Sequence, residues 1–161
     1  CFTLRDESMP VADPIIHEIT FRRSTDSADQ SDSTATLYEF ECVQGAYNVG
    51  SVFFVRNSWD EIQPLHFAFP TFDVTREDPD DFESAVTGVE ITGYTARDVL
   101  FFAEYDPETK RMSHWVKWRG LGDASESGSW LFIDGQFVLE SYRVDPSYDG
   151  EVNDIGIYPP R

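Results

Sequence analysis

Short runs of alternating apolar and polar residues, separated by turn-forming residues, make up most of this sequence. The pattern is clearest at residues 35–43, where Leu37 falls on one face and Tyr38, Phe40 and Cys42 fall on the other. A period of two residues is that of a β-strand, because successive side chains of a strand point to opposite faces of its sheet. We therefore expect a strand here whose aromatic face points inward.

Similar runs predict further strands along the rest of the chain. They span residues 15–22, 47–56, 63–72, 91–97, 99–105, 111–119, 129–133 and 137–144. Residues 91–97 and 99–105 are expected to form one bent strand. Asp134-Gly135 lies between the last two runs, and Asp-Gly between apolar runs is a strong signal for a tight hairpin. The spacing predicts an all-β antiparallel sandwich or barrel of about eight or nine strands, with at most a short helical turn within 76–85.

Length and composition are consistent with one globular domain spanning residues 1–161. Aromatic residues make up 15% of the chain, which argues against disorder. The net charge of −18 disfavours binding to nucleic acid or to an anionic membrane. No apolar run approaches the length of about 18 residues that a transmembrane helix needs. The chain starts with Cys1 rather than Met, so we expect a processed or trimmed product.

Two acidic segments are the only candidates for a metal site. Asp78, Asp80, Asp81 and Glu83 lie in one predicted loop, and a second group of acids follows Asp145. Calcium takes six to eight oxygen ligands from loops of this kind. Neither segment has the spacing of an EF-hand, so we favour a solvated charged surface and keep calcium binding as the alternative.

Residues 110–119 stand out from the acidic background, since they contain four basic residues and two tryptophans. On a strand, Arg111, Trp115 and Lys117 share one face, which is suited to stacking or to an anionic ligand. The interpretation we favour is an exposed strand whose cations pair with neighbouring acids. The sequence has no nucleophile-elbow motif, and the glutamates next to Cys42 disfavour a reactive thiolate. An enzyme is therefore the less favoured interpretation.

The two cysteines, Cys1 and Cys42, leave three interpretations open. They form a disulfide in an oxidising compartment, or Cys1 carries the lipid anchor of a bacterial lipoprotein, or both are inert thiols.

Two stretches resemble a known family when they are taken together. The first is C-V-Q-G-A-Y-N at 42–48, and the second is R-G-L-G-D at 119–123 followed by W-L-F-I-D-G-Q-F-V-L at 130–139. Their order and spacing resemble domain of unknown function 1176, a family of bacterial exported proteins without an assigned activity. The resemblance covers about residues 10–155, and it implies a periplasmic or extracellular protein.

The resemblance also bears on the cysteines. The resemblance implies one cysteine directly after G-L-G-D and another near the C-terminal end, at the positions where this chain has Ala124 and Tyr148. If those two family cysteines form a disulfide with each other, both would be lost together, as they are in this chain. The resemblance then implies that the remaining Cys42 pairs with Cys1. Such a bond would close a loop of about 40 residues and stabilise the fold by roughly 3–4 kcal/mol.

The motif residues have a structural and a functional interpretation. Arg119 and Asp123 are expected to bridge the R-G-L-G-D loop, and Gly45, Gly120 and Gly122 are expected to adopt backbone conformations closed to other residues. We favour such structural corners. As the alternative, the following residues line a binding site: Tyr47, Asn48, Trp115, Arg119 and Asp123. The sequence therefore predicts a non-enzymatic exported domain that binds a partner or stabilises an envelope assembly, with an envelope hydrolase using carboxylates and a calcium-binding module as alternatives.

Overall fold

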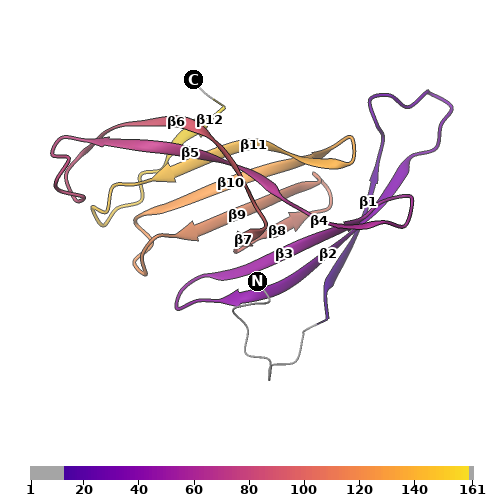
Figure 1. Ribbon diagram of the computed structural model, residues 1–161, viewed down its shortest axis with the longest axis horizontal. Coiled ribbons are helices and arrows are strands. Elements are labelled where there is room, and N and C mark those ends of the chain that lie inside the picture. The colour runs from indigo at the N-terminus through magenta and orange to yellow at the C-terminus, as the bar shows by residue number, and fades with distance from the viewer. Residues whose placement is uncertain (1–12, 160–161) are drawn as a thin grey trace.

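The computed structural model describes residues 13–159 and contains twelve β-strands in this range, with no helix among the described residues (Figure 1). All strand pairs are antiparallel and form two five-stranded sheets and a two-stranded hairpin. The predicted all-β class is therefore confirmed. None of the described segments could cross a bilayer as an apolar helix.

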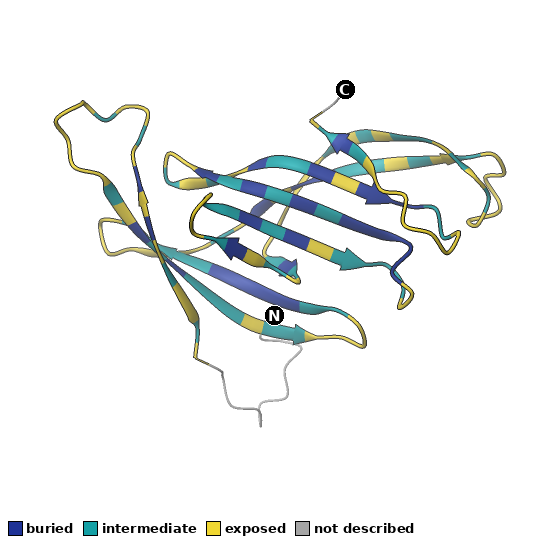
Figure 2. Cartoon of the chain, turned by 180° about the vertical axis from the view of Figure 1, so that it is seen from behind, coloured by how far each residue is buried: buried dark blue, intermediate teal, exposed yellow. Residues whose placement is uncertain are grey.

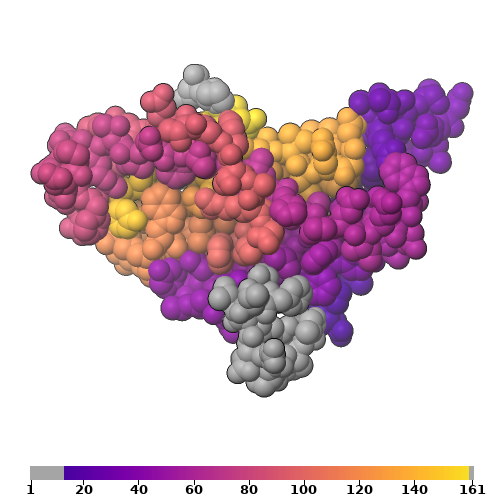
Figure 3. Space-filling model, viewed as in Figure 1, coloured from indigo at the N-terminus to yellow at the C-terminus, as the bar shows by residue number. Residues whose placement is uncertain are grey.

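The first sheet has the strand order β1-β2-β3-β4, with β7 also paired to β3. Its strands are β1 (Ile15–Phe21), β2 (Ser33–Gln44), β3 (Val49–Arg56), β4 (Ile62–Pro64) and β7 (Val99–Phe101). The loop between β1 and β2 protrudes from the body of the molecule (Figure 3).

The second sheet has the order β12-β11-β10-β9-β8. Its strands are β8 (Glu104–Asp106), β9 (Arg111–Lys117), β10 (Ser125–Ile133), β11 (Gln136–Asp145) and β12 (Ile155–Tyr158). The turn between β10 and β11 is the predicted hairpin. Asp134 and Gly135 have φ values of 53° and 91°, the positive values that a tight two-residue turn requires.

The third element is the hairpin of β5 (Phe67–Arg76) and β6 (Val86–Arg97), which crosses one face of the second sheet (Figures 1 and 3). Its Phe67 and Phe69 are fully buried, with ring centroids 5.3 and 5.0 Å from that of Trp130 in β10. The Trp130 indole N–H donates to the Ala68 carbonyl at 3.0 Å, so the largest buried side chain has its polar atom satisfied.

One apolar core joins the three elements. Its members include Leu37 and Phe53 from the first sheet and Met112, Trp130 and Tyr142 from the second. In Figure 2 the buried residues follow the central strands, and the loops at both ends are exposed.

The prediction that the aromatic face of β2 points inward was wrong. Leu37 is fully buried, whereas Tyr38 and Phe40 are only half-buried and lie on the outer face of the first sheet. There Phe40 packs edge-on against Phe54 of β3, at 5.8 Å between ring centroids. Alternation shows that two faces differ, but the face that turns inward is decided by the elements packed against the sheet.

Several strand boundaries also differ from the prediction. Residues 63–72 belong to two strands, β4 and β5, with a break at Leu65 and His66. Residues 91–105 contribute to three strands rather than to one bent strand, and residues 77–85 contain turns instead of a helical turn. Pro64 and Pro70 do lie on strands at the edges of their sheets, where a missing N–H is tolerated.

Cys42 is the extra residue of a β-bulge, because Glu41 pairs with Ser51 and Val43 pairs with Gly50. Cys1 lies outside the described residues, so the predicted Cys1–Cys42 disulfide and the alternative lipid anchor at Cys1 both stay predictions.

Candidate functional site

The two motif stretches, 42–48 and 119–123, lie next to each other across the boundary between the first and second sheets. The Asn48 side chain donates to the Lys117 carbonyl at 2.9 Å and accepts from the Lys117 N–H at 3.2 Å. The Tyr47 hydroxyl donates to the Trp118 carbonyl at 3.3 Å, and its ring packs against Gly120. The β2–β3 turn therefore holds the end of β9 and the start of the R-G-L-G-D loop.

Arg119 and Asp123 bridge this loop, as the sequence predicted. The guanidinium donates through Nε to Asp123 Oδ1 at 2.7 Å and through Nη2 to Oδ2. Asp123 is only 2% exposed, and its ion pair with Arg119 holds the pKa of its carboxyl well below the ordinary value, assisted by the Gly150 N–H. Gly122 has φ +81°, which lets the loop reverse within the few residues between the two partners.

Gly45 and Gly120 do not show the positive φ that the prediction implied. A Cβ at Gly45 would lie 3.2 Å from the Asn48 carbonyl oxygen, so close backbone approach explains this glycine. The glycines of the motifs therefore have different physical roles.

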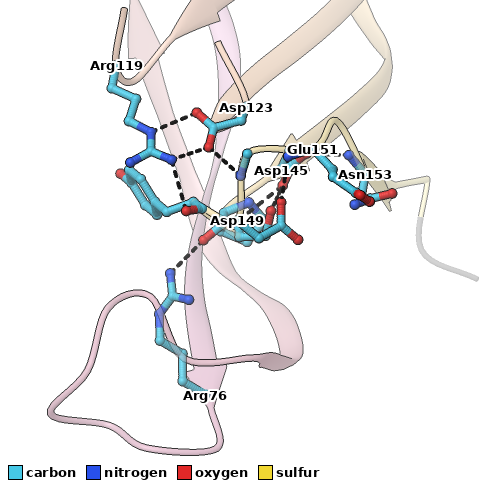
Figure 4. Close-up of polar contacts among 11 residues, drawn as sticks. Arg76, Arg119, Asp123, Asp145, Asp149, Glu151 and Asn153 are labelled. Carbon is cyan, nitrogen blue, oxygen red and sulfur yellow. Dashed lines mark hydrogen bonds and ion pairs between the residues drawn. The ribbon is translucent and has the colours of Figure 1, made fainter. Parts of the chain in front are cut away.

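The same ion pair fixes the C-terminal loop, residues 146–154 (Figure 4). Arg119 Nη2 donates to the Tyr148 carbonyl at 2.9 Å, and the Gly150 N–H donates to Asp123 Oδ2 at 2.8 Å. The Arg119 guanidinium also lies over the Tyr148 ring, 5.3 Å from its centroid. At the start of the loop, the fully buried Asp145 accepts from the Ser147 hydroxyl and from the Asn153 N–H.

A second arginine connects this loop to the β5–β6 hairpin. Arg76 donates through Nη1 to the Ser84 carbonyl at 3.0 Å and through Nη2 to the Pro146 carbonyl at 2.6 Å. Figure 4 shows Arg76 and Arg119 approaching the C-terminal loop from different sides. Phe82 adds an edge-to-face ring contact with Tyr148 at 5.7 Å.

The acidic loop of the β5–β6 hairpin, residues 77–85, and the C-terminal loop form the walls of one cleft, called the acidic cleft below. It has a volume of about 380 Å³. Its lining includes the carboxylates of Glu83, Asp145 and Asp149 and the amide of Asn153. Glu83 and Asp149 are exposed, although Asp149 Oδ1 accepts from the Glu151 N–H at 2.9 Å, whereas the carboxylate of Asp145 is buried and bonded to the loop it holds.

A family model described as "Protein of unknown function (DUF1176)" matches residues 16–155. The chain belongs to this family. No curated protein and no solved structure matched the chain.

The site residues predicted in this DUF1176 chain fall into two places. Tyr47, Asn48, Arg119 and Asp123 all contribute to the joint between the motifs. Trp115 does not join them: it is 38% exposed on the outer face of β9, beside Phe102 and under the Lys117 ammonium, 5.1 Å from the ring centroid.

The basic strand face of the DUF1176 chain is largely paired with acids. Arg111 donates to both oxygens of Glu140, at 2.6 and 2.7 Å, and this contact lowers the pKa of the Glu140 carboxyl. Arg111 on this face and Arg119 in the loop after β9 are therefore both held by carboxylates, which argues against an anion site there.

The structure does not bring the four predicted calcium ligands together in one site. Of Asp78, Asp80, Asp81 and Glu83, only Glu83 lines the acidic cleft. Asp78 and Asp81 accept hydrogen bonds from the amides of Asp80 and Glu83 and so shape their own loop. Within residues 13–159, no group of three or more histidine, cysteine, aspartate or glutamate residues is placed to hold a metal ion.

Sequence reasoning missed Arg76, Tyr148 and the meeting of the two acidic loops. Each loop was recognisable by its charge, but no pattern indicated that segments about 60 residues apart lie side by side. The resemblance gave a hint only to a different contact: Ala124 and Tyr148, the two positions that it singled out, lie in or directly after the segments that Arg119 and Asp123 connect.

Proposed function

We propose that this protein is a non-enzymatic exported binding domain, and that the acidic cleft holds a cationic group of its partner. One observation carries the proposal. Two acidic loops distant in sequence form opposite walls of one cleft, and Arg76 and Arg119 hold both walls through hydrogen bonds that leave the cleft-lining Glu83 and Asp149 exposed.

The charges in the cleft favour a cation. Among residues 13–159, neither Glu83 nor Asp149 lies within 4.0 Å of a basic nitrogen. A concave site lined by charges of one sign concentrates the electrostatic field and raises the local concentration of counter-ions. The net charge of −18 adds a long-range attraction for cations.

The contacts behind the cleft favour binding without a large rearrangement. The C-terminal loop is fixed at Pro146, Tyr148 and Gly150 by hydrogen bonds from or to side chains outside the loop. A site whose walls are ordered before binding loses less conformational entropy when the ligand arrives.

The carboxyl groups of the described region favour binding over acid–base catalysis. Those with a shifted pKa are Asp106, Asp123, Asp134 and Glu140, and in each the pKa is lowered, mainly by hydrogen bonds to the carboxylate. A general acid working near neutral pH needs the opposite shift. None of these four carboxyl groups is therefore a candidate acid for the hydrolase alternative.

The test is calorimetric titration of the protein with an acetylated tetra-lysine peptide at low salt. The double variant Glu83→Gln/Asp149→Asn should lose about tenfold or more in affinity. The control Asp29→Asn/Glu108→Gln removes the same charge from exposed acids outside the cleft, and it should change affinity by less than about twofold. Equal losses in both variants would show that only the overall charge attracts the peptide, which contradicts the proposal.

Calcium binding by the same loops stays an untested alternative. A calcium titration of the same two double variants separates the candidates. Saturable heat with calcium that the cleft variant loses would favour the calcium module.

Export is tested separately, by locating the protein in periplasmic, membrane and cytoplasmic fractions of producing cells. Recovery in the cytoplasm alone would contradict that part of the proposal.

A further inference from the structure

A second cavity lies at the opposite end of the β10–β11 hairpin from the acidic cleft. Asp134 and Gly135 of the β10–β11 turn line it, whereas Asp145, at the other end of β11, lines the acidic cleft. The cavity has a volume of about 210 Å³ and is enclosed by the ends of three hairpins. The other two are the β1–β2 hairpin, with Phe21 and Arg23, and the β3–β4 turn, with Trp59.

Trp59 is the most unusual residue of this cavity, because it is 70% exposed. The backbone of the turn that carries it is nevertheless fixed. Asn57 Oδ1 accepts from the N–H groups of Trp59 and Glu61, at 2.9 and 3.2 Å, and Asp60 adopts the left-handed conformation with φ 63°. The Arg23 guanidinium lies 5.3 Å from the indole centroid and 5.9 Å from that of Phe21, so it covers one side of the indole ring. The indole is therefore presented to solvent from a hydrogen-bonded turn.

The rest of the lining is mostly uncharged and polar. Thr34, Ser58 and Gln63 contribute two hydroxyls and an amide that form no side-chain hydrogen bond with another described residue. The one carboxylate, Asp134, already accepts from the Ser24 N–H at 2.6 Å and from the Ser24 hydroxyl at 2.8 Å. The unoccupied neutral groups thus offer donors and acceptors beside an aromatic ring, and the charge of the Arg23 guanidinium in the lining is balanced by nearby Asp134.

We propose that this cavity binds one or two pyranose units of a neutral carbohydrate. A sugar ring has an apolar C–H face that packs on an indole, and a rim of hydroxyls that both donate and accept. An amide and hydroxyls next to an exposed ring match both features. The net charge of −18 disfavours an anionic sugar. The inference is independent of the acidic cleft.

The test follows the indole N–H signals of the four tryptophans by NMR during titration with cellobiose and, separately, with N,N′-diacetylchitobiose. Saturable movement of the Trp59 signal is expected with at least one disaccharide, while the Trp115 signal stays in place. Trp59→Ala should abolish binding, as judged by the Gln63 side-chain amide signal, and Trp59→Phe should retain part of it. Gln63→Ala should weaken binding by about fivefold or more, whereas Gln44→Ala, exposed and outside the cavity, should not.

Two outcomes would overturn the inference. One is a Trp59 signal that does not move with either disaccharide up to the limit of solubility. The other is equal movement of the Trp59 and Trp115 signals, which would indicate weak stacking on any exposed indole. Circular dichroism of each variant checks that loss of binding does not reflect loss of the fold.

Discussion

The side chain of Asn48 replaces a strand at the end of β9: it pairs with both the N–H and the carbonyl of Lys117. A planar amide with one donor and one acceptor reproduces the pairing that a neighbouring backbone would provide. The two sequence stretches that carry the family resemblance are therefore connected by one residue's side chain. This pairing gives a structural reason for an asparagine at this position.

Asn48→Ala should destabilise the protein by about 1–3 kcal/mol, because it leaves two partly buried backbone groups of Lys117 without partners. Urea unfolding followed by tryptophan fluorescence measures the change. The control is Gln44→Ala on the same hairpin, where the side chain is exposed and an effect within about 0.5 kcal/mol is expected. A loss for Asn48→Ala no larger than that of the control would refute this role.

Arg119→Lys should release the C-terminal loop while the sheets stay folded. Lysine keeps the charge but cannot provide the planar fork that contacts Asp123 and the Tyr148 carbonyl together. Hydrogen exchange at the Gly150 amide should accelerate by about tenfold or more, since that amide bonds to Asp123. Arg22→Lys, in the protruding β1–β2 loop, serves as the control. Unchanged exchange at Gly150 would show that the loop does not depend on Arg119.

The buried His114 should make stability depend on pH. Its Nδ1 accepts from the Phe101 N–H at 2.8 Å, and burial, assisted by the positive charge of Arg97, lowers its pKa from 6.5 to about 3. Between these values the unfolded chain binds a proton that the folded protein does not, so this residue's contribution to stability falls as the pH falls. The slope is about 1.4 kcal/mol per pH unit.

The measurement is the free energy of unfolding across this pH range for the wild type and for His114→Phe. The variant loses the hydrogen bond to Phe101 at every pH. The informative quantity is therefore how the difference in free energy of unfolding between the wild type and the variant changes with pH. Relative to the variant, the wild type should become less stable toward acid. A difference that is constant with pH would contradict the assignment.

Substitutions of two adjacent phenylalanines of β3 test which face of the first sheet packs into the core. Phe53 is 1% exposed and packs on Phe67, whereas Phe54 lies on the outer face with Phe40. Phe53→Ala should cost about 3–5 kcal/mol in stability, and Phe54→Ala should cost less than about half of that. Comparable losses measured by urea unfolding would show that the outer face is covered as completely as the core.

The predicted disulfide between Cys1 and Cys42 is tested by thiol titration of the protein from an oxidising compartment, before and after unfolding. No free thiol should be detected in either state, and reduction should lower stability by about 3–4 kcal/mol. Two thiols in the unfolded protein would rule the bond out. Mass spectrometry of the intact chain distinguishes a disulfide from a lipid-modified Cys1.

The all-β class, the family and the β10–β11 hairpin could be predicted from the sequence. Alternation with period two, Asp-Gly turns and aromatic-rich short runs are local properties, and local chemistry decides strand formation and turn type. The Arg119–Asp123 bridge was also accessible, because its partners are separated by only a short glycine-containing loop. The strand breaks at His66 and within 91–105 were not, since they depend on where the hairpin crosses the second sheet.

The candidate sites show the same division. The sequence by itself determined that residues 77–85 and the segment after Asp145 are acidic, and that Arg111 shares a face with Trp115. Only the tertiary structure decided that the two acidic segments face each other, that Trp59 stands beside Gln63, and that Trp115 lies apart from Tyr47. The physical reason is that charge and periodicity are carried by neighbouring residues, whereas a cleft forms where sheets pack, and packing is decided by the shape and burial of residues far apart in the chain.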